Sequence, residues 1–566
     1  MRTIVWRLTT ALLPALLLHG PQFASAAVPD VTGTWVARQN SPMGEMEFVF
    51  RLKAEANGHL GGSVNSPFAD APVLDGTISG NDIELTIETE SFGDLQRRTV
   101  QGKLVGDELQ FESAALMPGP PSGGPPRGAP GPAGPGGPAG PGGPPGPGGP
   151  GPAAGAFAGG PPPMNLPQTL IARRGTPTPS FKAGPVDYKT LPKVELPALK
   201  ALPANQLAMK PPMGWNSWNK FHTKIDDQAV RGIADALVAS GMRDAGYIYV
   251  NIDDGWEGTR DSNGVLQPNA NFPDMKALAD YVHSKGLKLG LYSSPGPRTC
   301  GGFEGSYGHE EIDARTWARW GIDYLKYDWC SASRIWQNAD MRAVYQRMGE
   351  AIRAAGRPMV YSLCQYGLAD VESWGPLVGG NLWRTTGDIF DSWMPMLQNI
   401  SAQETLAGSA APGHWNDPDM LEVGNGGMTA REYRAHFSLW AIAAAPLIAG
   451  NDVRTLDADT RDILLNKEVI AVNQDRSGKQ GRRVAQQGEI DIWLRSLSGG
   501  AYALAAVNRG DADADVATQW SDLALPADLR ARDLWLHRDL GALKKGYQGR
   551  VPAHGVVMLR LQRDHS

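Results

Sequence analysis

The middle of the chain alternates short apolar runs with longer segments in which apolar residues recur every three or four positions. The runs resemble buried strands and the longer segments resemble amphipathic helices. Eight strand–helix repeats within residues 208–481 predict a (β/α)8 barrel, whose active site lies at the carboxyl ends of its strands. The eight expected strands are 213–218, 247–256, 287–294, 324–328, 359–364, 382–388, 413–420 and 446–453.

The flanking regions have a different pattern, because apolar and polar residues alternate with a period of two between turn signals such as Asn57-Gly58. This pattern predicts an N-terminal all-β domain over residues 27–174, either a sandwich or a small barrel, and a second all-β domain over residues 482–566. A Pro/Gly-rich insert at 118–163 cannot bury a core, and alternation resumes after it, so we expect a long loop before the last strand. The proline-rich residues 175–207 are expected to form a linker.

Residues 1–26 have the pattern of a secretory signal peptide. Arg2 and Arg7 precede a short apolar run, and Ala24-Ser25-Ala26 is a small-residue cleavage site. The apolar run is too short to span a bilayer, and nothing later in the sequence resembles a membrane span. We therefore expect export to the periplasm or outside the cell.

Export affects how the three cysteines are interpreted, because disulfides persist in oxidising compartments. Cys300 and Cys330 each follow an expected strand and would lie at the same end of neighbouring strands. We predict a Cys300–Cys330 disulfide and a buried, free Cys364; the alternative, three reduced structural cysteines, stays open. No CxxC motif or histidine cluster indicates a metal site.

Charge and composition narrow the classes of partner. The formal net charge is −6, from 53 basic and 59 acidic residues that are mixed along the chain. No basic run indicates nucleic-acid binding. The 17 tryptophans suit stacking on sugar faces as well as core packing, and the core is expected to take most of them.

Two carboxylates stand out at the ends of expected barrel strands. Asp328 ends the run 324–328, with Lys326 on the same face, and Asp388 follows Arg384 in the run 382–388. Glycoside hydrolysis requires such a pair, one carboxylate to attack the sugar and one to handle the proton. The alternative for both residues is helix capping or an ordinary salt bridge.

Five motifs in order, MGWNSW, NIDDGW, LKYDWC, RTTGD and WNDPDM, resemble glycoside hydrolase family 27, the α-galactosidase or melibiase family. The resemblance runs from about Pro211 to Gly481. It implies a retaining exo-glycosidase without cofactors that acts on terminal α-galactosyl units of oligosaccharides or polysaccharides. It also implies that Asp328 is the nucleophile, that Asp388 is the acid/base, and that the C-terminal domain is an antiparallel β-sandwich.

The resemblance extends to a sugar-binding shell. Asp253 and Asp254 match a pair that accepts hydrogen bonds from sugar hydroxyls, and Trp218 matches the tryptophan that covers one face of the sugar. Further substrate-binding positions are expected at Tyr292, Lys326, Gln365, Arg384 and Asp419. Trp256 and Trp415 are expected in the core, with Asp417 as a turn residue before Pro418.

The sequence departs from the family pattern at a few positions. Gln365 stands where galactose-preferring animal members have Glu, and an amide can still bond a 2-hydroxyl. Leu368 is bulky where relatives that accept N-acetylgalactosamine carry small residues, which argues against a 2-acetamido group. Asp253 with Asp254 favours galactose over L-arabinopyranose, and Cys364 lacks the partner cysteine that animal enzymes carry near Gly380.

Two other functions stay open at this point. One is a relative with shifted sugar specificity, such as a β-L-arabinopyranosidase. The other, from a different class, is a non-catalytic carbohydrate-binding protein on a barrel scaffold, although the presence of both carboxylates argues against it.

Overall fold

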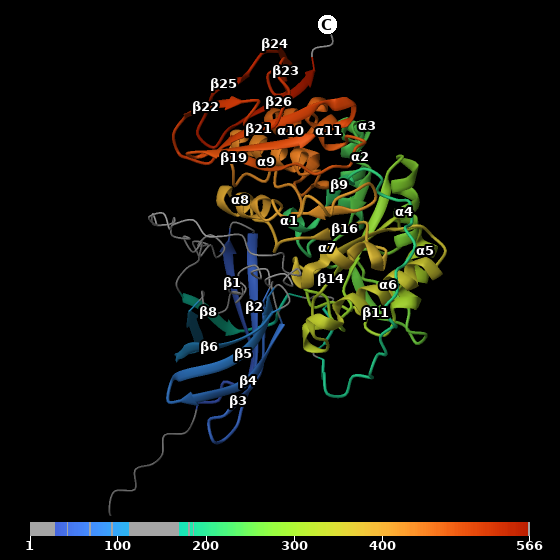
Figure 1. The fold of residues 1–566 in the computed structure, drawn as a ribbon. Helices are drawn as coiled ribbons and strands as arrows, with labels where there is room; N and C mark the ends of the chain where they lie inside the picture. Colours follow the sequence, from blue (N-terminus) through green and yellow to red (C-terminus); the bar gives the residue numbers. More distant parts are fainter. Residues whose placement is uncertain are drawn as a thin grey trace, which may run out of the picture.

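A computed structural model describes residues 29–41, 44–66, 70–91, 94–112, 169–178, 182–184 and 186–563. Figure 1 shows an N-terminal β-domain, a central barrel with helices around it, and a C-terminal β-domain above the helices α9 and α11. The expected signal peptide and the Pro/Gly-rich insert lie outside the described residues. Within the residues described, no helix combines the length and apolar character needed to cross a membrane.

The N-terminal domain is a closed antiparallel barrel of eight strands, which decides between the two predicted all-β architectures. Each strand pairs with the next, and β1 also pairs with β8. Alternate side chains point inward, so Trp35, Phe50 and Phe111 form its core. The expected last strand is β8. The bounds are β1 (Gly33–Ser41), β2 (Gly44–Ala54), β3 (Leu60–Asn65), β4 (Asp70–Ser79), β5 (Asp82–Ser91), β6 (Asp94–Val105), β7 (Glu108–Glu112) and β8 (Thr169–Arg174).

The segment expected to be a linker lies along the central domain, and from residue 186 to 207 it forms no helix or strand. Its backbone carbonyls accept hydrogen bonds from the Tyr307 hydroxyl at Pro192 (2.9 Å) and from Arg347 at Glu195 (3.1 Å). At its end the amides of Asn205 and Asn381 bond each other twice, at 2.9 Å. The segment therefore forms a strap that follows the outside of the barrel, and Figure 1 shows it as the teal trace.

The central domain contains all eight predicted parallel strands. Their order runs from β17 through β16, β15, β14, β13, β10 and β9 to β18. Leu421, after β17, forms a parallel bridge with Ala449 of β18 and closes the ring. Several strands are shorter than expected because the polar ends of the runs are already loops. The bounds are β9 (Met213–Asn216), β10 (Tyr249–Asn251), β13 (Lys288–Ser293), β14 (Tyr324–Asp328), β15 (Val360–Cys364), β16 (Leu382–Arg384), β17 (Trp415–Asp417) and β18 (Leu447–Ala449).

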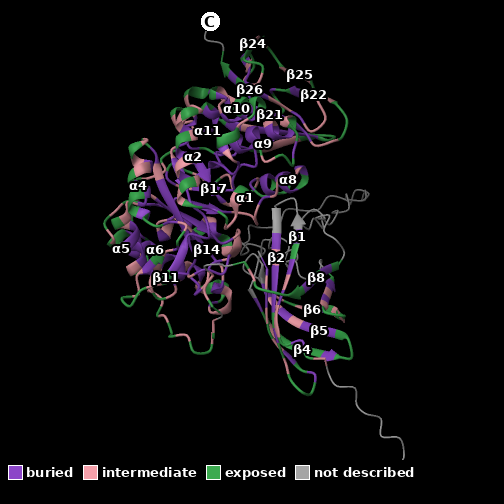
Figure 2. Ribbon diagram, turned by 180° about the vertical axis from the view of Figure 1, so that it is seen from behind, coloured by how far each residue is buried: buried purple, intermediate pink, exposed green. Residues whose placement is uncertain are grey.

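Helices cover the outside of this ring, and Figure 2 shows the strands and inward helix faces as buried. In α2 the Asp226 side chain caps the N-terminus by accepting from the Ala229 amide at 2.7 Å, and Val230, Ile233 and Leu237 face the core. A hairpin of β11 (Glu257–Arg260) and β12 (Leu266–Pro268) follows β10. The helices are α1 (Trp218–Phe221), α2 (Asp227–Ala239), α3 (Met242–Ala245), α4 (Met275–Ser284), α5 (Glu310–Trp320), α6 (Met341–Ala354), α7 (Val371–Trp374), α8 (Trp393–Ser401), α9 (Ala430–Ile442), α10 (Ala458–Leu464) and α11 (Lys467–Asn473).

The C-terminal domain consists of two antiparallel sheets, one of six strands and one of two. Buried Arg495 joins it to the barrel helices, because its guanidinium donates to the carbonyl oxygens of Ala441 (2.7 Å) and Asn473 (3.3 Å). The strands are β19 (Arg482–Gln487), β20 (Ile490–Ser496), β21 (Tyr502–Asn508), β22 (Ala514–Gln519), β23 (Leu529–Asp533), β24 (Arg538–Leu543), β25 (Gly546–Val551) and β26 (Val556–Arg563).

Candidate active site

Polar side chains gather at the carboxyl ends of the barrel strands, as the sequence pattern predicts. Strand β14 ends at Asp328, and β16 ends at Arg384, four residues before Asp388. The loops after β10, β13 and β15 supply Asp254, Gly301 and Gln365. Parallel strands place these loops at one rim of the ring, so residues distant in sequence share one site.

Asp328 is buried and oriented by three neighbours. The Tyr292 hydroxyl donates to Oδ2 (3.1 Å), and the Trp329 amide donates to Oδ1 (2.8 Å). Burial raises the pKa of Asp328, the Lys326 ammonium and a hydrogen bond from Tyr366 oppose that rise, and the Asp388 carboxylate adds to it. The charge of Asp388 therefore reaches the Asp328 carboxyl.

Asp388 differs from Asp328 because its side chain is 42% exposed. The Arg384 guanidinium, itself buried, donates to Asp388 Oδ1 (3.0 Å) and lies 3.1 Å from Asp419 Oδ2. Asp419 has a φ of 90°, a strained backbone for a residue with a side chain, and the Ile389 amide donates to its Oδ2. Arg384 thus holds Asp388 in place, because its guanidinium is itself anchored by the buried Asp419.

Lys326 and Asp253 form a second buried ion pair. The Lys326 ammonium lies 2.8 Å from Asp253 Oδ2, which also accepts from the Asn216 amide at 2.7 Å. Burial acts to lower the pKa of Lys326, but the neighbouring carboxylates, led by Asp253, raise it well above its usual value. Lys326 therefore stays positively charged between Asp253 and Asp328.

Asp254 and Gln365 each present a buried oxygen without a protein partner. The Gly301 amide donates to Asp254 Oδ2 (2.5 Å), whereas Oδ1 has no hydrogen bond among the described residues. The Gln365 amide donates weakly to the Arg384 carbonyl (3.4 Å), and its Oε1 also lacks a described donor. Buried acceptors are normally paired, so these two oxygens are suited to accept hydrogen bonds from a ligand's hydroxyls.

Two tryptophans expected in the core, Trp256 and Trp415, are buried there, whereas Trp218 lies partly exposed at the rim. Trp218 begins α1 and is half-buried, with an edge-on contact to His222. Trp256 and Trp415 are fully buried, and both indole nitrogens donate to backbone carbonyls. Asp417 accepts from the Asp419 amide at 2.9 Å, which is a turn contact around Pro418.

The predicted disulfide forms beside these carboxylates. Cys300 and Cys330 are bonded, with their Cα atoms 5.1 Å apart, and Cys364 is free and buried. The two sulfurs and a carboxylate oxygen of Asp328 all lie within 4.8 Å of one another. Because both thiols are consumed in the disulfide, this cluster cannot act as a thiolate metal site.

Sequence reasoning missed Tyr366, which follows Gln365 directly. Its hydroxyl lies 3.5 Å from each sulfur of the disulfide and bonds Asp328. Its φ of 61° turns the chain sharply after β15. The only sequence signal was its place in CQYGL, beside a position already assigned to the site. Asn216 was missed in the same way, inside the motif MGWNSW.

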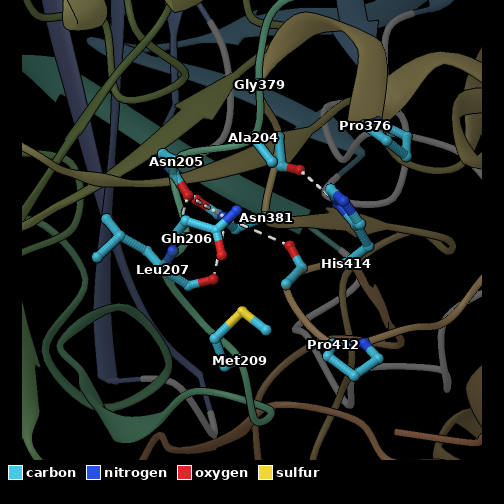
Figure 3. A pocket seen from close by; sticks show the side chains of 12 residues that line it. Ala204, Asn205, Gln206, Leu207, Met209, Pro376, Gly379, Asn381, Pro412 and His414 are labelled. Atoms are coloured by element: carbon cyan, nitrogen blue, oxygen red, sulfur yellow. Dashed lines mark hydrogen bonds between the residues drawn. The ribbon is translucent and has the colours of Figure 1, made fainter.

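A small pocket at the other end of the barrel lacks these groups. Figure 3 shows Asn205 and Leu207 of the strap, and Met209 just after it, against Asn381 and His414, which precede β16 and β17. These positions lie at the amino ends of the strands. The strap covers this end, and the paired carboxylates lie at the opposite end.

Comparison with known proteins agrees with this geometry. A family model described as alpha galactosidase A matches residues 210–475, and one described as the alpha galactosidase C-terminal beta sandwich domain matches residues 487–561. Together they cover more than half of the chain. The chain belongs to the alpha-galactosidase family.

Members of the family from distant organisms resemble this chain over similar spans. Alpha-galactosidase A of Cellvibrio japonicus is 47% identical over 380 residues, which cover 63% of this chain and 93% of the relative. Alpha-galactosidase 2 of Arabidopsis thaliana is 48% identical over 365 residues, covering 63% and 91%. The crystal structure of alpha-galactosidase I from Mortierella vinacea is 38% identical with a TM-score of 0.61, covering 63% and 98%.

Proposed function

We propose that this chain is a retaining α-galactosidase with Asp328 as the nucleophile and Asp388 as the acid/base. The observation that carries the proposal is the pair of interacting carboxylates at the ends of β14 and β16, on a chain of the alpha-galactosidase family. Retention requires two carboxyl groups about 5 to 5.5 Å apart, one to attack the anomeric carbon and one to protonate the leaving oxygen, and we expect that separation between Asp328 and Asp388 when a sugar is bound.

The two acids are placed in environments that suit different roles. Tyr292 and the Trp329 amide orient the Asp328 carboxylate, and Lys326 favours its charged form, as attack requires. Asp388 is half-exposed and can exchange its proton with solvent. In the first step an Asp328 oxygen bonds the anomeric carbon while Asp388 gives its proton to the leaving sugar oxygen. In the second step water releases the sugar from Asp328, and Asp388 recovers a proton.

The unpaired oxygens of Asp254 and Gln365 support recognition of a hydroxylated sugar. Asp253, held by Lys326 and Asn216, adds another carboxylate at the same rim. We propose that Asp253 and Asp254 bind hydroxyls of a terminal galactose, that Gln365 faces its 2-hydroxyl, and that Trp218 covers its apolar face. Tyr292, Lys326, Arg384 and Asp419 complete the site through their bonds to these acids.

Azide rescue separates the two roles. Asp328→Gly leaves space for azide on the nucleophile's side, so it should give β-galactosyl azide, of inverted configuration. Asp388→Gly keeps the nucleophile and should give α-galactosyl azide. We expect the rate without azide to fall by about 10³ or more in Asp328→Gly.

Proton NMR of the wild-type reaction should show the α-anomer of galactose first, and the β-anomer first would contradict retention.

A second candidate function is hydrolysis of β-L-arabinopyranosides. A structure of a β-L-arabinopyranosidase from Geobacillus stearothermophilus is 25% identical to this chain, with a TM-score of 0.59. L-Arabinopyranose lacks the hydroxymethyl group of galactose, so the two substrates differ at one carbon. Comparing kcat/KM for nitrophenyl α-D-galactopyranoside and nitrophenyl β-L-arabinopyranoside decides between them; the galactoside should be preferred.

We also propose that the protein is exported, after cleavage of residues 1–26, to the periplasm or the medium. The support is the basic, apolar and small-residue order at the N-terminus. Expression of the full chain followed by intact-mass measurement should give a protein that begins at Ala27 in the exported fraction. An uncleaved N-terminus in cytoplasm alone would contradict the proposal.

A further inference from the structure

The sugar site is framed by two loops that the disulfide joins. The loop after β13 carries Cys300 and Gly301, and the loop after β14 carries Cys330 and the 3-10 helix η2 (Ala332–Arg334). Gly301 donates to Asp254, and the disulfide lies beside Asp328. A shift of either loop would therefore move groups that contact Asp254 or lie beside Asp328.

The strap reaches the first of these loops at its start. The Ala183 amide donates to the Gly302 carbonyl at 3.0 Å. In return, the Arg298 guanidinium donates twice to the Gly184 carbonyl, at 2.8 and 3.0 Å. These bonds lie on both sides of Cys300 and Gly301 in the sequence.

The N-terminal barrel reaches the second loop through an ion pair. Arg334 of η2 lies 2.6 Å from Glu88 of β5 and also donates to the Glu88 carbonyl at 3.2 Å. The two side chains are only 12% and 13% exposed. Because this ion pair is largely shielded from solvent and has a backbone hydrogen bond beside it, it can fix how the barrel sits against η2. An exposed ion pair would not do so. The Tyr188 ring of the strap lies under the same guanidinium.

The described part of the N-terminal barrel does not offer an aromatic platform for sugar. Its described aromatic residues, Trp35, Phe48, Phe50 and Phe111, are all buried in its own core. Its contacts outside its own strands instead include the strap, where Glu47 accepts from Thr178, and η2, where Glu88 accepts from Arg334. In addition, the matching family model begins only at residue 210, so the barrel and most of the strap are additions to the region that the family model covers.

We propose that the N-terminal barrel and strap brace the two disulfide-joined loops, and that the Glu88–Arg334 pair is the contact through which the barrel sets affinity for the galactoside. Arg334 is a positioning residue in this scheme, because it acts through the loop that carries Cys330. The inference rests on the proposed function where it concerns affinity. The holding of the loops is independent of which reaction the site performs.

A double-mutant cycle tests the kinetic consequence in the full-length protein. Glu88→Ala and Arg334→Ala should each raise KM for nitrophenyl α-galactoside about three- to tenfold, with kcat changed less than about twofold. The effect of the double variant on KM should be smaller than the two single effects combined, because both changes remove the same Glu88–Arg334 ion pair. Arg334→Lys keeps the charge and should lie between Arg334→Ala and the wild type.

A second readout measures the loops without substrate. A dithiol can attack the Cys300–Cys330 bond only when a sulfur is accessible. If the loops loosen, dithiothreitol should therefore reduce this disulfide faster. We expect Glu88→Ala and Arg334→Ala to speed reduction about threefold or more. The new thiols are counted after a denaturing quench, against the one thiol of Cys364.

Glu108→Ala is the matched control. Glu108 pairs with Arg173 at 2.5 Å between β7 and β8, so its loss perturbs the same barrel without touching η2. Its KM and reduction rate should equal those of the wild type. Wild-type values for folded Glu88→Ala and Arg334→Ala, or equal changes in Glu108→Ala, would overturn the proposal. If the wild type hydrolyses no galactoside, the proposed function fails, and the reduction rates still test the brace.

Discussion

Two buried acids follow β10, Asp254 in the loop and Glu257 at the start of β11, and they show how strongly burial changes a carboxyl group. Burial raises the pKa of Asp254 to about 7. Burial also raises the pKa of Glu257 well above its usual value, and the charge of Asp254 adds to that rise. At mildly acidic pH, Asp254 is therefore a neutral group in the folded site.

This environment predicts a pH-dependent stability difference between the wild type and Asp254→Asn. A pKa raised from 3.8 to about 7 means that folding favours the protonated acid. The contribution of Asp254 to the free energy of unfolding is therefore full below pH 4 and is lost as the pH rises to about 7. Asn cannot ionise and does not lose that contribution. The Tm of Asp254→Asn relative to wild type should therefore rise from pH 4.5 to 7.5, whereas parallel Tm curves would contradict the raised pKa.

Tyr366 leads to a prediction about the pH–rate profile. Its hydrogen bond to Asp328 lowers the pKa of that acid against the effect of burial. In Tyr366→Phe the pKa of Asp328 should rise, so the acidic limb of kcat/KM should move to higher pH and the rate at its optimum should fall about tenfold. The control is Tyr281→Phe, which removes a hydroxyl on α4 that bonds Asp235, and it should leave the profile unchanged. An unmoved acidic limb in Tyr366→Phe would refute the role of the hydroxyl.

At the scale of elements, the disulfide joins loops that follow neighbouring strands β13 and β14. It closes 30 residues of sequence. Replacing both Cys300 and Cys330 by Ser should lower the free energy of unfolding by about 3 to 4 kcal/mol, from the loop-closure entropy alone. Urea unfolding measures this loss, and Cys364→Ser, which changes the free thiol, should cost less than about 1.5 kcal/mol. Equal losses in the two variants would argue against the entropic account.

The sequence predicted these elements unevenly. All eight barrel strands were found because each is a short apolar run. Asp328 and Asp388 stood out because they follow two of these runs, whereas the sugar-binding positions were expected from the family resemblance. Positions such as Tyr366 were missed because a positive φ in a non-glycine residue leaves no pattern in one sequence. The strap could not be distinguished from a free linker, since a proline-rich extended segment has no periodicity and several of its contacts, such as those at Pro192 and Glu195, are made by backbone carbonyls. Closure of the N-terminal strands into a barrel depends on long-range pairing, which alternation alone does not determine.

At the scale of the whole molecule, Arg495 joins the C-terminal domain to α9 and α11. The side chain is fully buried and burial lowers its pKa to about 10, so it stays charged at neutral pH. Arg495→Ala should lower the free energy of unfolding by about 3 kcal/mol or more, because it leaves a void and two buried carbonyls without their donor. Arg495→Met fills the void and should lose less. Thermal unfolding measures both, and kcat below the transition should match the wild type; a lowered kcat would mean that the domain contact reaches the site.

The closure of the central ring at Leu421 has a consequence for motion. Strands β14 and β15 pair over five residues, whereas the join between Leu421 and β18 has two hydrogen bonds, from Leu421 to Ile448 and from Gly450 to Leu421. This join is thinner than the pairing of β14 with β15, so amide hydrogen exchange should be faster at Leu421 and Gly450 than in those two strands. Leu421 comes two residues after Asp419, which holds the guanidinium beside Asp388. A thin join of the cylinder thus lies two residues from the carboxylate that holds Arg384 beside Asp388, the acid/base in our proposal.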